Sequence, residues 1–382
     1  MTRMQRIGAV ALCVGLAAAV ALPAFLRAAP PGGKTAAVKS RSPSTINDDL
    51  NATQAQISKL MPPTPALLAD AGFRAGDGAK VLPLLKKMIG LLEEMEHADV
   101  DDGTVESARR GRYIMMAYSV ALGDKETETK LTAAAQLKGD EGVAAATWLS
   151  LGRWLTASKD AAAQQKIIDD VGALAKANPK SEELVSVLAA MSQVGAATPE
   201  LSTKALEIVR TNLKSDMATE LIAQADAAQA QKDMIGKPLT FGGRTSTGGK
   251  FSTTEYQGKV VLVDFWATWC GPCIAGLPEV KKVYADFHGK GLEMVGVSCD
   301  SADDVLNKFI AENSMPWVQL RDSSQVDERT KWHPIAKQYG VDGIPAMFLI
   351  DRKGVLRYVD AREDLAKKVA ELVAESDKPA AK

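Results

Sequence analysis

Aromatic residues, histidines and net charge are all scarce in this sequence. Aromatics make up 5% of its 382 residues and hydrophobic residues 46%, so most of the apolar content is alanine, leucine and valine. Such a composition favours a large helical part, and the length predicts two or three domains. The 46 Lys and Arg residues nearly balance the 47 Asp and Glu residues, which gives no support for nucleic acid as a partner. The three histidines are scattered without the spacing of metal ligands, so no bound metal is expected.

The chain also has only four cysteines, yet two of them are separated by just two residues. They are Cys270 and Cys273, in the stretch VVLVDFWATWCGPCIAGLPEV. A Cys-x-x-Cys pair can be half of a zinc site, a structural disulfide or a redox-active dithiol. The residues around the pair decide between these three possibilities.

The first 29 residues have the layout of an export signal. Arg3 and Arg6 give a positive start, an apolar stretch follows from Ile7 to Leu26, and small residues precede a Pro/Gly-rich segment. The apolar stretch is also about the ~20 residues that a membrane helix needs. Residues 1–29 are therefore predicted to be a signal peptide or an uncleaved membrane anchor, and the protein to be periplasmic or otherwise extracytoplasmic.

Two regions of different character follow this leader. Residues 30–78 are rich in Ser, Thr, Ala, Gln and Pro and are predicted to be a linker or a weakly ordered segment. Residues 79–232 show apolar residues at helical spacing between short breaks, which predicts an all-α region of helical hairpins. Trp148-x-x-Leu151-Gly152 is like the start of a tetratricopeptide repeat, but the rest of that pattern is weak, so a generic helical bundle is the alternative. This region either binds a protein partner or holds the C-terminal part away from the membrane.

Residues 236–376 are predicted to form an α/β domain, followed by a short tail over 377–382. A hairpin is expected near Leu239–Phe251, and then strands alternate with helices. Such alternation implies a central sheet with helices on both faces. The expected strands are 260–265, 292–300, 317–322, 346–351 and 355–360, and the expected helices are 272–287, 303–313, 335–341 and 361–374.

The redox interpretation explains the neighbours of the cysteine pair best. A structural zinc site needs four ligands, and neither Cys299 nor the histidines supply a second pair. A structural disulfide across Gly271 and Pro272 would close too small a ring to restrict the unfolded chain. In contrast, a buried strand brings Cys270 to the tip of the sheet, and Pro272 then begins a helix whose positive end lowers the pKa of the leading thiol. Cys270 is therefore expected to be the exposed attacking thiolate and Cys273 the resolving thiol one turn inside.

The sequence WCGPC, preceded by VDFWAT and followed about seventy residues later by YGVDGIPAMFLID, resembles the thioredoxin superfamily. The resemblance covers Gly236 to about Val373. The hairpin lead-in and the segment GVSCDSADDVLNKFIAENSMPW are more similar to the exported TlpA/ResA-like branch, which implies a part in cytochrome c maturation. The family implies a reactive disulfide that faces a cis-proline loop, here Pro345 after Ile344. A cis bond there would leave the Ile344 backbone free to pair with the partner's chain.

Three positions depart from the pattern of that branch. Gly276 stands where the branch usually carries an acidic residue, and Ala346 follows the cis-proline position in place of the common Thr. Asp264 matches the buried acid of cytosolic-type thioredoxins, where many exported relatives carry Asn. Either Asp264 is a polar residue at a strand end, or it handles the proton of Cys273. A carboxylate in an apolar strand is costly to bury without a task, which favours the second interpretation.

The sequence as a whole predicts an exported thiol–disulfide oxidoreductase, and the Gly-Pro between the cysteines resembles reducing members of the superfamily. The expected catalytic residues are Cys270, Cys273, Asp264 and Pro345, and the expected substrate-binding residues are Trp269, Gly271, Pro272 and Ile344. Trp269 has a packing role as its alternative, and Cys299 is expected to be a small core residue. No cofactor is expected beyond the redox-active disulfide.

The expected partners are protein thiols and disulfides as substrates, a membrane or periplasmic thiol electron donor, and a possible protein partner of the helical region. A thiol peroxidase is the alternative enzyme, although its Pro-x-x-x-Thr-x-x-Cys pattern is absent around Cys270. A helical adaptor with a docking thioredoxin-like domain is the alternative of another class.

Overall fold

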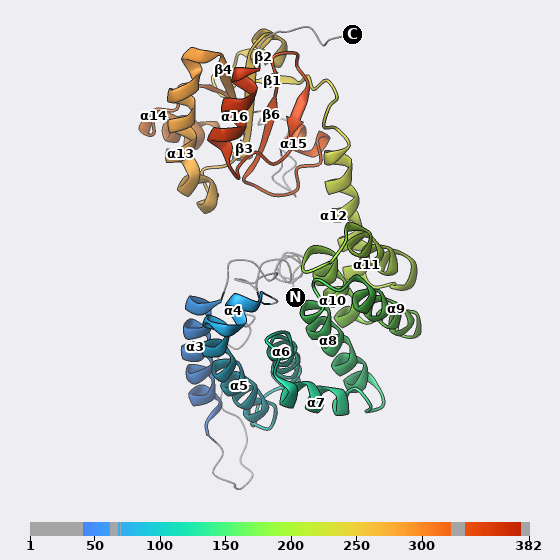
Figure 1. Cartoon of the computed structure of the whole chain (residues 1–382). Coiled ribbons are helices and arrows are strands. Elements are labelled where there is room, and N and C mark those ends of the chain that lie inside the picture. The colour runs from blue at the N-terminus through green and yellow to red at the C-terminus, as the bar shows by residue number, and fades with distance from the viewer. Residues whose placement is uncertain (1–40, 62–67, 69, 322–332, 376–382) are drawn as a thin grey trace. The chain divides into compact units, whose positions relative to one another are not determined.

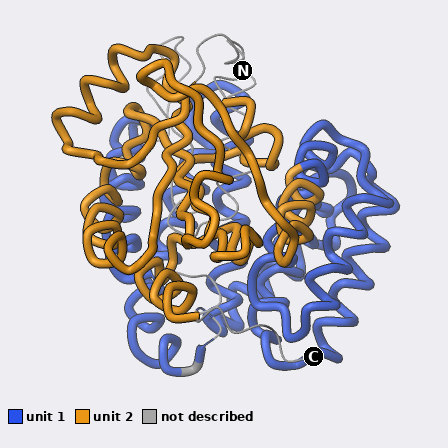
Figure 2. Tube along the Cα trace, turned by 90° about the horizontal axis from the view of Figure 1, so that it is seen from above, with its two compact units in different colours: residues 1–223 blue, residues 224–382 orange. Residues whose placement is uncertain are grey.

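The computed structural model describes residues 41–61, 68, 70–321 and 333–375. The chain divides into two compact units, residues 1–223 and 224–382 (Figures 1 and 2). The boundary falls within one helix, α12 (Asp216–Lys232). The Gln231 side-chain amide donates to the backbone carbonyl oxygens of Tyr339 and Gly340 at 3.2 and 2.6 Å. The end of α12 therefore belongs to the C-terminal unit, whereas the sequence assigned it to the helical region.

The first unit is helical throughout its described part. Its other helices are α3 (Pro43–Leu60), α4 (Ala71–Ala75), α5 (Asp77–Glu96), α6 (Asp102–Ala121), α7 (Lys125–Ala134), α8 (Asp140–Thr156), α9 (Ala161–Ala177), α10 (Glu182–Gln193) and α11 (Pro199–Asn212). Most of them begin at a Ser or Asp whose side chain accepts a hydrogen bond from a backbone N–H of the first turn, for example Asp101 and Ser181. The helical nature of this region, expected from its spacing of apolar residues, is confirmed.

The expectation that residues 30–78 form a linker is wrong for α3, for α4 and for the first residues of α5. The clearest case is α3. This helix begins at the Ser42 cap with Pro43 in its first turn, and Ile46, Leu50 and Ile57 are buried in the core of the first unit. Those three apolar residues keep a helical spacing, but they stand among so many Ser, Thr, Gln and Asn residues that composition hid the period. The Pro-Pro-Thr-Pro part of the expected linker falls within residues 62–67, which lie outside the described residues.

Helices α6, α8 and α10 pack in succession within this unit. Gly152 lies at the contact between α6 and α8, where a Cβ would approach the Ala117 carbonyl oxygen and the Val120 side chain at 2.8 Å. Only glycine allows the two helices this approach. Trp148 is buried and its indole N–H donates to Glu183 on α10 at 2.8 Å. The Trp-x-x-Leu-Gly stretch thus serves the core of the first unit, and its relation to a tetratricopeptide repeat stays a prediction.

The second unit contains a five-stranded mixed sheet of order β5-β4-β3-β6-β7. Its strands are β3 (Val260–Trp266), β4 (Leu292–Ser298), β5 (Val318–Leu320), β6 (Ala346–Ile350) and β7 (Leu356–Tyr358). β3 pairs parallel with β4 and antiparallel with β6, so it is the central strand, and each of its residues is buried. The expected hairpin forms a separate two-stranded sheet of β1 (Gly242–Arg244) and β2 (Lys250–Ser252).

Helices pack on both faces of this sheet, as the alternation of elements predicted (Figure 1). They are α13 (Gly271–Phe287), α14 (Asp303–Glu312), α15 (Pro334–Gln338) and α16 (Leu365–Ala374). The last helix begins at Leu365 rather than at Ala361. The Ala361 N–H donates to the Met347 carbonyl oxygen of β6 at 3.0 Å, and Asp364 adopts a left-handed backbone, so the intervening residues form a loop at the edge of the site described below.

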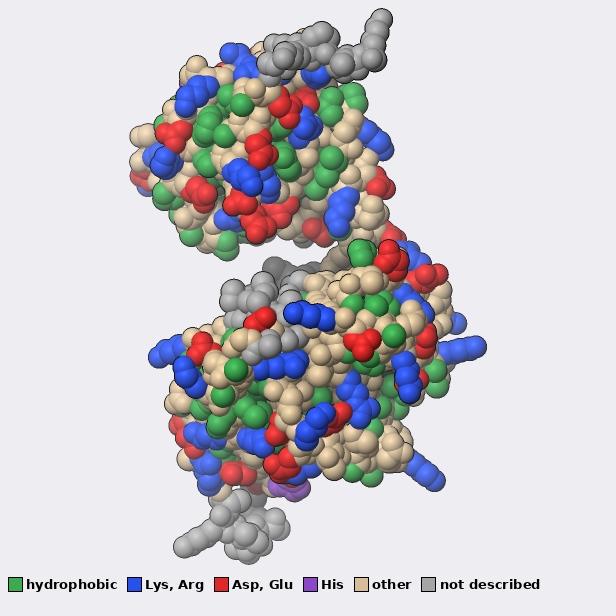
Figure 3. All heavy atoms as spheres, in the orientation of Figure 1, with side chains coloured by type: hydrophobic (Ala, Val, Ile, Leu, Met, Phe, Trp, Pro, Cys, Tyr) green, Lys and Arg blue, Asp and Glu red, His purple; other side chains and the backbone are tan. Residues whose placement is uncertain are grey.

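Acidic and basic side chains are interspersed over the face drawn in Figure 3. This distribution agrees with the near balance of charge in the sequence. Within the part of the chain that the structure describes, no helix is both long enough and apolar enough to cross a membrane. The predicted leader at residues 1–29 lies outside the described residues.

Candidate active site

Cys270 and Cys273 are joined by a disulfide at the start of α13. Cys270 is the N-cap residue of this helix, and its sulfur accepts a hydrogen bond from the Cys273 backbone N–H at 3.2 Å. Pro272 occupies the first turn, where the missing N–H costs nothing. The sulfur of Cys270 therefore lies at the positive end of a 17-residue helix, which stabilises a thiolate there once the disulfide is reduced.

The expected order of exposure of the two cysteines is wrong for this disulfide form. Cys270 is buried, with only 5% of its surface exposed, whereas Cys273 is only partly buried and is therefore the more exposed of the two. The reason is packing: Cys270 forms a small apolar cluster with Ala267 and Cys299, and Ile344 packs against the same cluster. The sequence could not show this, because Cys299 lies at the end of β4 and reaches Cys270 only through the sheet.

The residues around the disulfide form an exposed surface next to the cis-proline loop. Trp269 is 58% exposed, and Gly271 and Pro272 are exposed as well. The Ile344–Pro345 peptide bond is cis, as the resemblance implied. Pro345 lines the same small pocket as Cys273. All the residues proposed for partner binding are thus near the disulfide, and Trp269 points to solvent rather than into the core.

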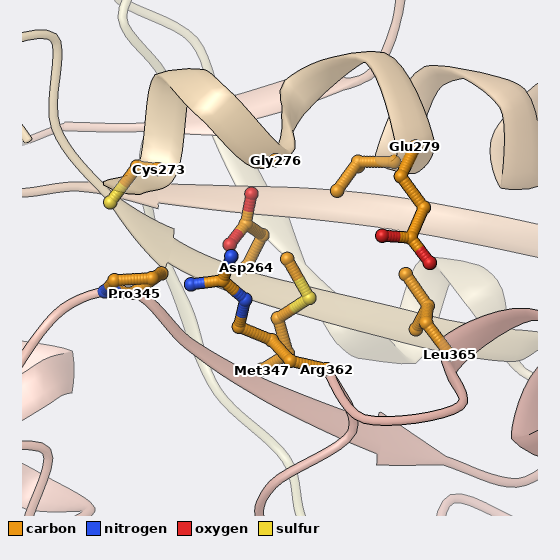
Figure 4. Close-up of a pocket in the computed structure, with 9 residues that line it drawn as sticks. Asp264, Cys273, Gly276, Glu279, Pro345, Met347, Arg362 and Leu365 are labelled. Carbon is orange, nitrogen blue, oxygen red and sulfur yellow. The ribbon is translucent and has the colours of Figure 1, made fainter. Parts of the chain in front are cut away.

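Asp264 lies on β3, the central strand of the sheet, and lines the same pocket as Cys273 (Figure 4). It is 6% exposed, and its Oδ1 atom is buried without a hydrogen-bond partner. Burial raises the pKa of Asp264 from 3.8 to about 7, although the nearby positive charge of Arg362 opposes the rise. Asp264 and Cys273 line one pocket of about 20 Å³, a volume sufficient for a single water molecule. The arrangement therefore places a carboxyl that titrates near neutral pH beside the inner cysteine.

Two residues of the site were missed from the sequence. One is Asp300, whose carboxylate accepts hydrogen bonds from the Thr268 N–H at 3.1 Å, the Thr268 hydroxyl at 2.5 Å and the Ser298 hydroxyl at 2.8 Å. It fixes the loop between β3 and Cys270. The available signal was a polar residue directly after a buried strand, on the same edge of the sheet as the cysteines.

The second missed residue is Arg362, in the loop before α16. Its Nη2 atom lies 3.5 Å from the Pro272 carbonyl oxygen, and its guanidinium lines the pocket of Asp264 and Cys273 (Figure 4). Nothing in the local sequence indicated this position, because the sequence assigned Arg362 to the last helix. Cys299, in contrast, is buried as expected, and burial raises the pKa of its thiol to about 11.

A match to a known protein family lies within the second unit. Residues 235–359 match the AhpC/TSA family. The chain is 34% identical over 161 residues to the thiol:disulfide interchange protein DsbE of Pseudomonas fluorescens biotype C, a match that covers 40% of this chain and 84% of that protein. It is 31% identical over 107 residues to the thiol-disulfide oxidoreductase ResA of Bacillus thuringiensis subsp. konkukian, covering 28% of this chain and 57% of that protein.

Two solved structures are similar to a part of the chain. One is the thioredoxin domain of a thiol-disulfide oxidoreductase from Bacteroides vulgatus, with 30% identity, a TM-score of 0.33, and coverage of 36% of this chain and 97% of that one. The other is a thiol:disulfide interchange protein from Bacteroides sp., with 28% identity, a TM-score of 0.32, and coverage of 38% and 93%. The match to DsbE, which covers 84% of that protein at 34% identity, shows that the chain belongs to the thioredoxin-like thiol-disulfide oxidoreductase family.

Proposed function

We propose that the second unit catalyses thiol–disulfide exchange with protein substrates through Cys270 and Cys273, without a dissociable cofactor. The observation that carries this proposal is the disulfide at the N-terminus of α13 beside the cis Ile344–Pro345 bond. In the reduced protein, the Cys270 thiolate attacks a partner disulfide and forms a mixed disulfide, and one partner sulfur leaves as a thiolate. Cys273 then attacks Cys270, closes the disulfide again and releases the second partner sulfur. The partner is reduced by two electrons and the dithiol is oxidised.

In this proposal Asp264 handles the proton of the resolving step. The Cys273 thiol must lose its proton when it attacks, and partial burial opposes that loss. Asp264 shares its pocket, lacks a hydrogen-bond partner at Oδ1 and has a pKa near 7, so it can accept the proton at neutral pH. The structure supports no role for Gly276 as an acid, since it has no side chain.

We further propose that the protein acts outside the cytoplasm as a reductase. The Gly-Pro pair between the cysteines and the leader-like residues 1–29 support this direction and location. The electron donor would then be a membrane or periplasmic thiol. Cytochrome c maturation is the corresponding process that the resemblance to the exported branch supports.

The test is reduction of insulin or a small aromatic disulfide by the full chain, with dithiothreitol as the electron source. Cys270→Ser should abolish turnover, and Cys273→Ser should stop after the mixed disulfide, which mass spectrometry would detect as a covalent adduct. Consumption of hydrogen peroxide measured in parallel tests the alternative peroxidase. Turnover of peroxide faster than of the disulfide would overturn the proposed reaction.

For the helical unit we propose binding of a partner protein through a groove. The groove measures about 800 Å³ and is bordered by α6 and by the N-terminal turns of α8 and α10. Five acidic and three basic side chains line it. Both arginines are paired, Arg109 with Glu96 and Glu106 and Arg110 with Glu183, whereas Asp140, Glu141 and Glu182 have no ion pair among the described residues. Lys180 also has no ion pair among the described residues, so three acids and one base are left unpaired. Their net negative charge favours a positively charged segment of the partner.

This proposal is tested with a fluorescent Lys/Arg-rich peptide and a Glu-rich peptide of equal length. The basic peptide should bind the full chain more tightly than the acidic one, with an affinity that falls as salt is added. Glu182→Gln should weaken the binding and Lys180→Gln should strengthen it, because both lie in the groove with opposite charge. Equal binding of the two peptides, or no response to either substitution, would refute a groove for a basic segment.

A further inference from the structure

The guanidinium of Arg362 lies next to Gly276, at the edge of the pocket that Asp264 and Cys273 line. A Cβ atom at position 276 would lie 2.9 Å from Arg362 Nη2, so the guanidinium, the end of a flexible side chain, would have to move to admit it. The same Nη2 atom lies 3.5 Å from the Pro272 carbonyl oxygen. The guanidinium thus keeps its present position beside α13 because residue 276 has no side chain.

Within the described residues, the guanidinium of Arg362 forms no ion pair with an acidic side chain, and its hydrogen bond goes to the Pro272 carbonyl oxygen. Its guanidinium points toward the space between Asp264, Cys273 and Pro345 (Figure 4). Of the described residues that line this pocket, Arg362 is the one cation, and the titratable groups are Asp264, Cys273 and Glu279. The carboxylate of Glu279 is drawn on the Leu365 side of the pocket, away from Cys273 (Figure 4). β6 and α16 contribute the apolar Met347 and Leu365.

We propose that Arg362 is a positioning residue for the resolving step, and that Gly276 is the residue that leaves room for its guanidinium. This inference rests on the proposed thiol–disulfide exchange. When the Cys273 proton passes to the Asp264 carboxylate, the negative charge moves from oxygen to sulfur within one small pocket. A fixed positive charge beside both atoms favours the ionised form of each, so the transfer needs no rearrangement of solvent. Arg362 itself exchanges no proton.

The arrangement explains why the chain functions without an acid at position 276. A carboxylate there would need the volume that the guanidinium now fills, and it would form an ion pair with Arg362 at the surface. The positive charge of Arg362 would then be neutralised by this ion pair and would no longer act on Asp264 and Cys273. The role of Arg362 in this chain therefore depends on the glycine at position 276, although the two residues lie on different elements.

The test is a stopped-flow reaction of the reduced full chain with 5,5′-dithiobis(2-nitrobenzoate) over a range of pH. Attack by Cys270 releases the first nitrothiobenzoate and resolution by Cys273 releases the second, so the two phases report the two steps separately. Arg362→Ala should move the pH midpoint of the second phase upward by about one pH unit, and slow that phase about tenfold at neutral pH. The first phase should change far less. Arg362→Lys should recover most of the rate.

Two further variants test the coupling between Gly276 and Arg362, and a third serves as the control. Gly276→Ala retains Arg362 but displaces its guanidinium, so it should reproduce the slow second phase, and the Gly276→Ala/Arg362→Ala double variant should be no slower than either single variant. Lys367→Ala, which removes an exposed cation from α16, is the matched control and should leave both phases unchanged.

The outcomes separate this inference from the proposed function. If the wild-type chain shows no two-phase reaction, the thiol–disulfide exchange itself is wrong. If the wild type reacts in two phases but Arg362→Ala keeps the same pH midpoint, or slows both phases equally, Arg362 has no positioning role. A full additive effect in the double variant would overturn the coupling of Gly276 to Arg362.

Discussion

Asp264→Asn should make the stability of the second unit less sensitive to pH. The pKa of Asp264 is raised from 3.8 to about 7 in the folded protein because burial opposes its charged form. Between these two values the unfolded chain has released the proton while the folded chain retains it, so folding loses stability as the pH rises. Over the full window the loss approaches about 4 kcal/mol, at about 1.4 kcal/mol for each pH unit. Asparagine does not titrate and has no such loss.

The stability of the variant at a single pH does not isolate the effect of the charge, because the Asn side chain also places a polar group at the buried Oδ1 position, which has no hydrogen-bond partner. The change with pH isolates the carboxyl. From about pH 5 to pH 8, the free energy of unfolding of Asp264→Asn relative to the wild type should increase by about 3 kcal/mol. Below about pH 4 the advantage should no longer depend on pH.

Hydrogen exchange of the β3 amides in the oxidised full chain measures this free energy locally, without requiring both units to unfold together. Glu279→Gln is the matched control, since it removes an exposed carboxylate from the edge of the same pocket. A carbon-13 titration of the Asp264 carboxyl gives its pKa directly. If Asp264→Asn has the same relative stability at pH 5 and pH 8, the carboxyl is ionised throughout, and its proposed role as proton acceptor near neutral pH is refuted.

Three other predictions follow from the site. Cys299→Ser should keep disulfide reduction near the wild-type rate, because this thiol is buried with a raised pKa, whereas Cys270→Ser should abolish it; loss of activity in Cys299→Ser would show that a third thiol takes part. Asp300→Ala should lower the melting temperature and slow attack by Cys270, since it removes two hydrogen bonds from Thr268 in the loop before the cysteine and one from Ser298; an unchanged attack rate would show that α13 alone fixes Cys270. A fragment from Gln224 to the C-terminus should fold and reduce model disulfides, while a fragment from Gly236, which lacks the Gln231 hydrogen bonds, should melt at a lower temperature; equal melting temperatures would make the end of α12 dispensable.

The order of strands and helices in the second unit could be predicted because it is encoded locally. Val260–Trp266 is an uninterrupted apolar run apart from Asp264, and the Cys-Gly-Pro-Cys sequence places a proline where a helix accepts one. The boundaries were predicted less well where tertiary contacts decide them. The last helix starts late because Ala361 bonds to β6 and Arg362 extends to the cysteine helix, and neither contact has a signal in the residues next to it.

The exposure of the cysteines could not be predicted for a related reason. A helix N-terminus predicts the electrostatics of Cys270, but its burial depends on Cys299 and Ile344, which come from β4 and from the loop before β6. In the first unit, the polar composition of residues 43–60 hid helix α3, because a helix needs only a few buried positions and the rest of its surface can be rich in Ser, Thr and Gln.

Gly276 shows how a departure from a family pattern is explained by structure rather than by sequence. Taken alone, a glycine in place of an acid suggests a lost function, and the sequence offers Asp264 as its substitute. In the structure, the guanidinium of Arg362 lies next to Gly276 and approaches the carbonyl oxygen of Pro272, a residue 90 positions earlier in the chain. The buried carboxyl of Asp264 and the guanidinium of Arg362 then share one pocket with Cys273. The proton acceptor and the positive charge thus come from β3 and from the loop before α16, and α13 contributes the sulfur and the space between them.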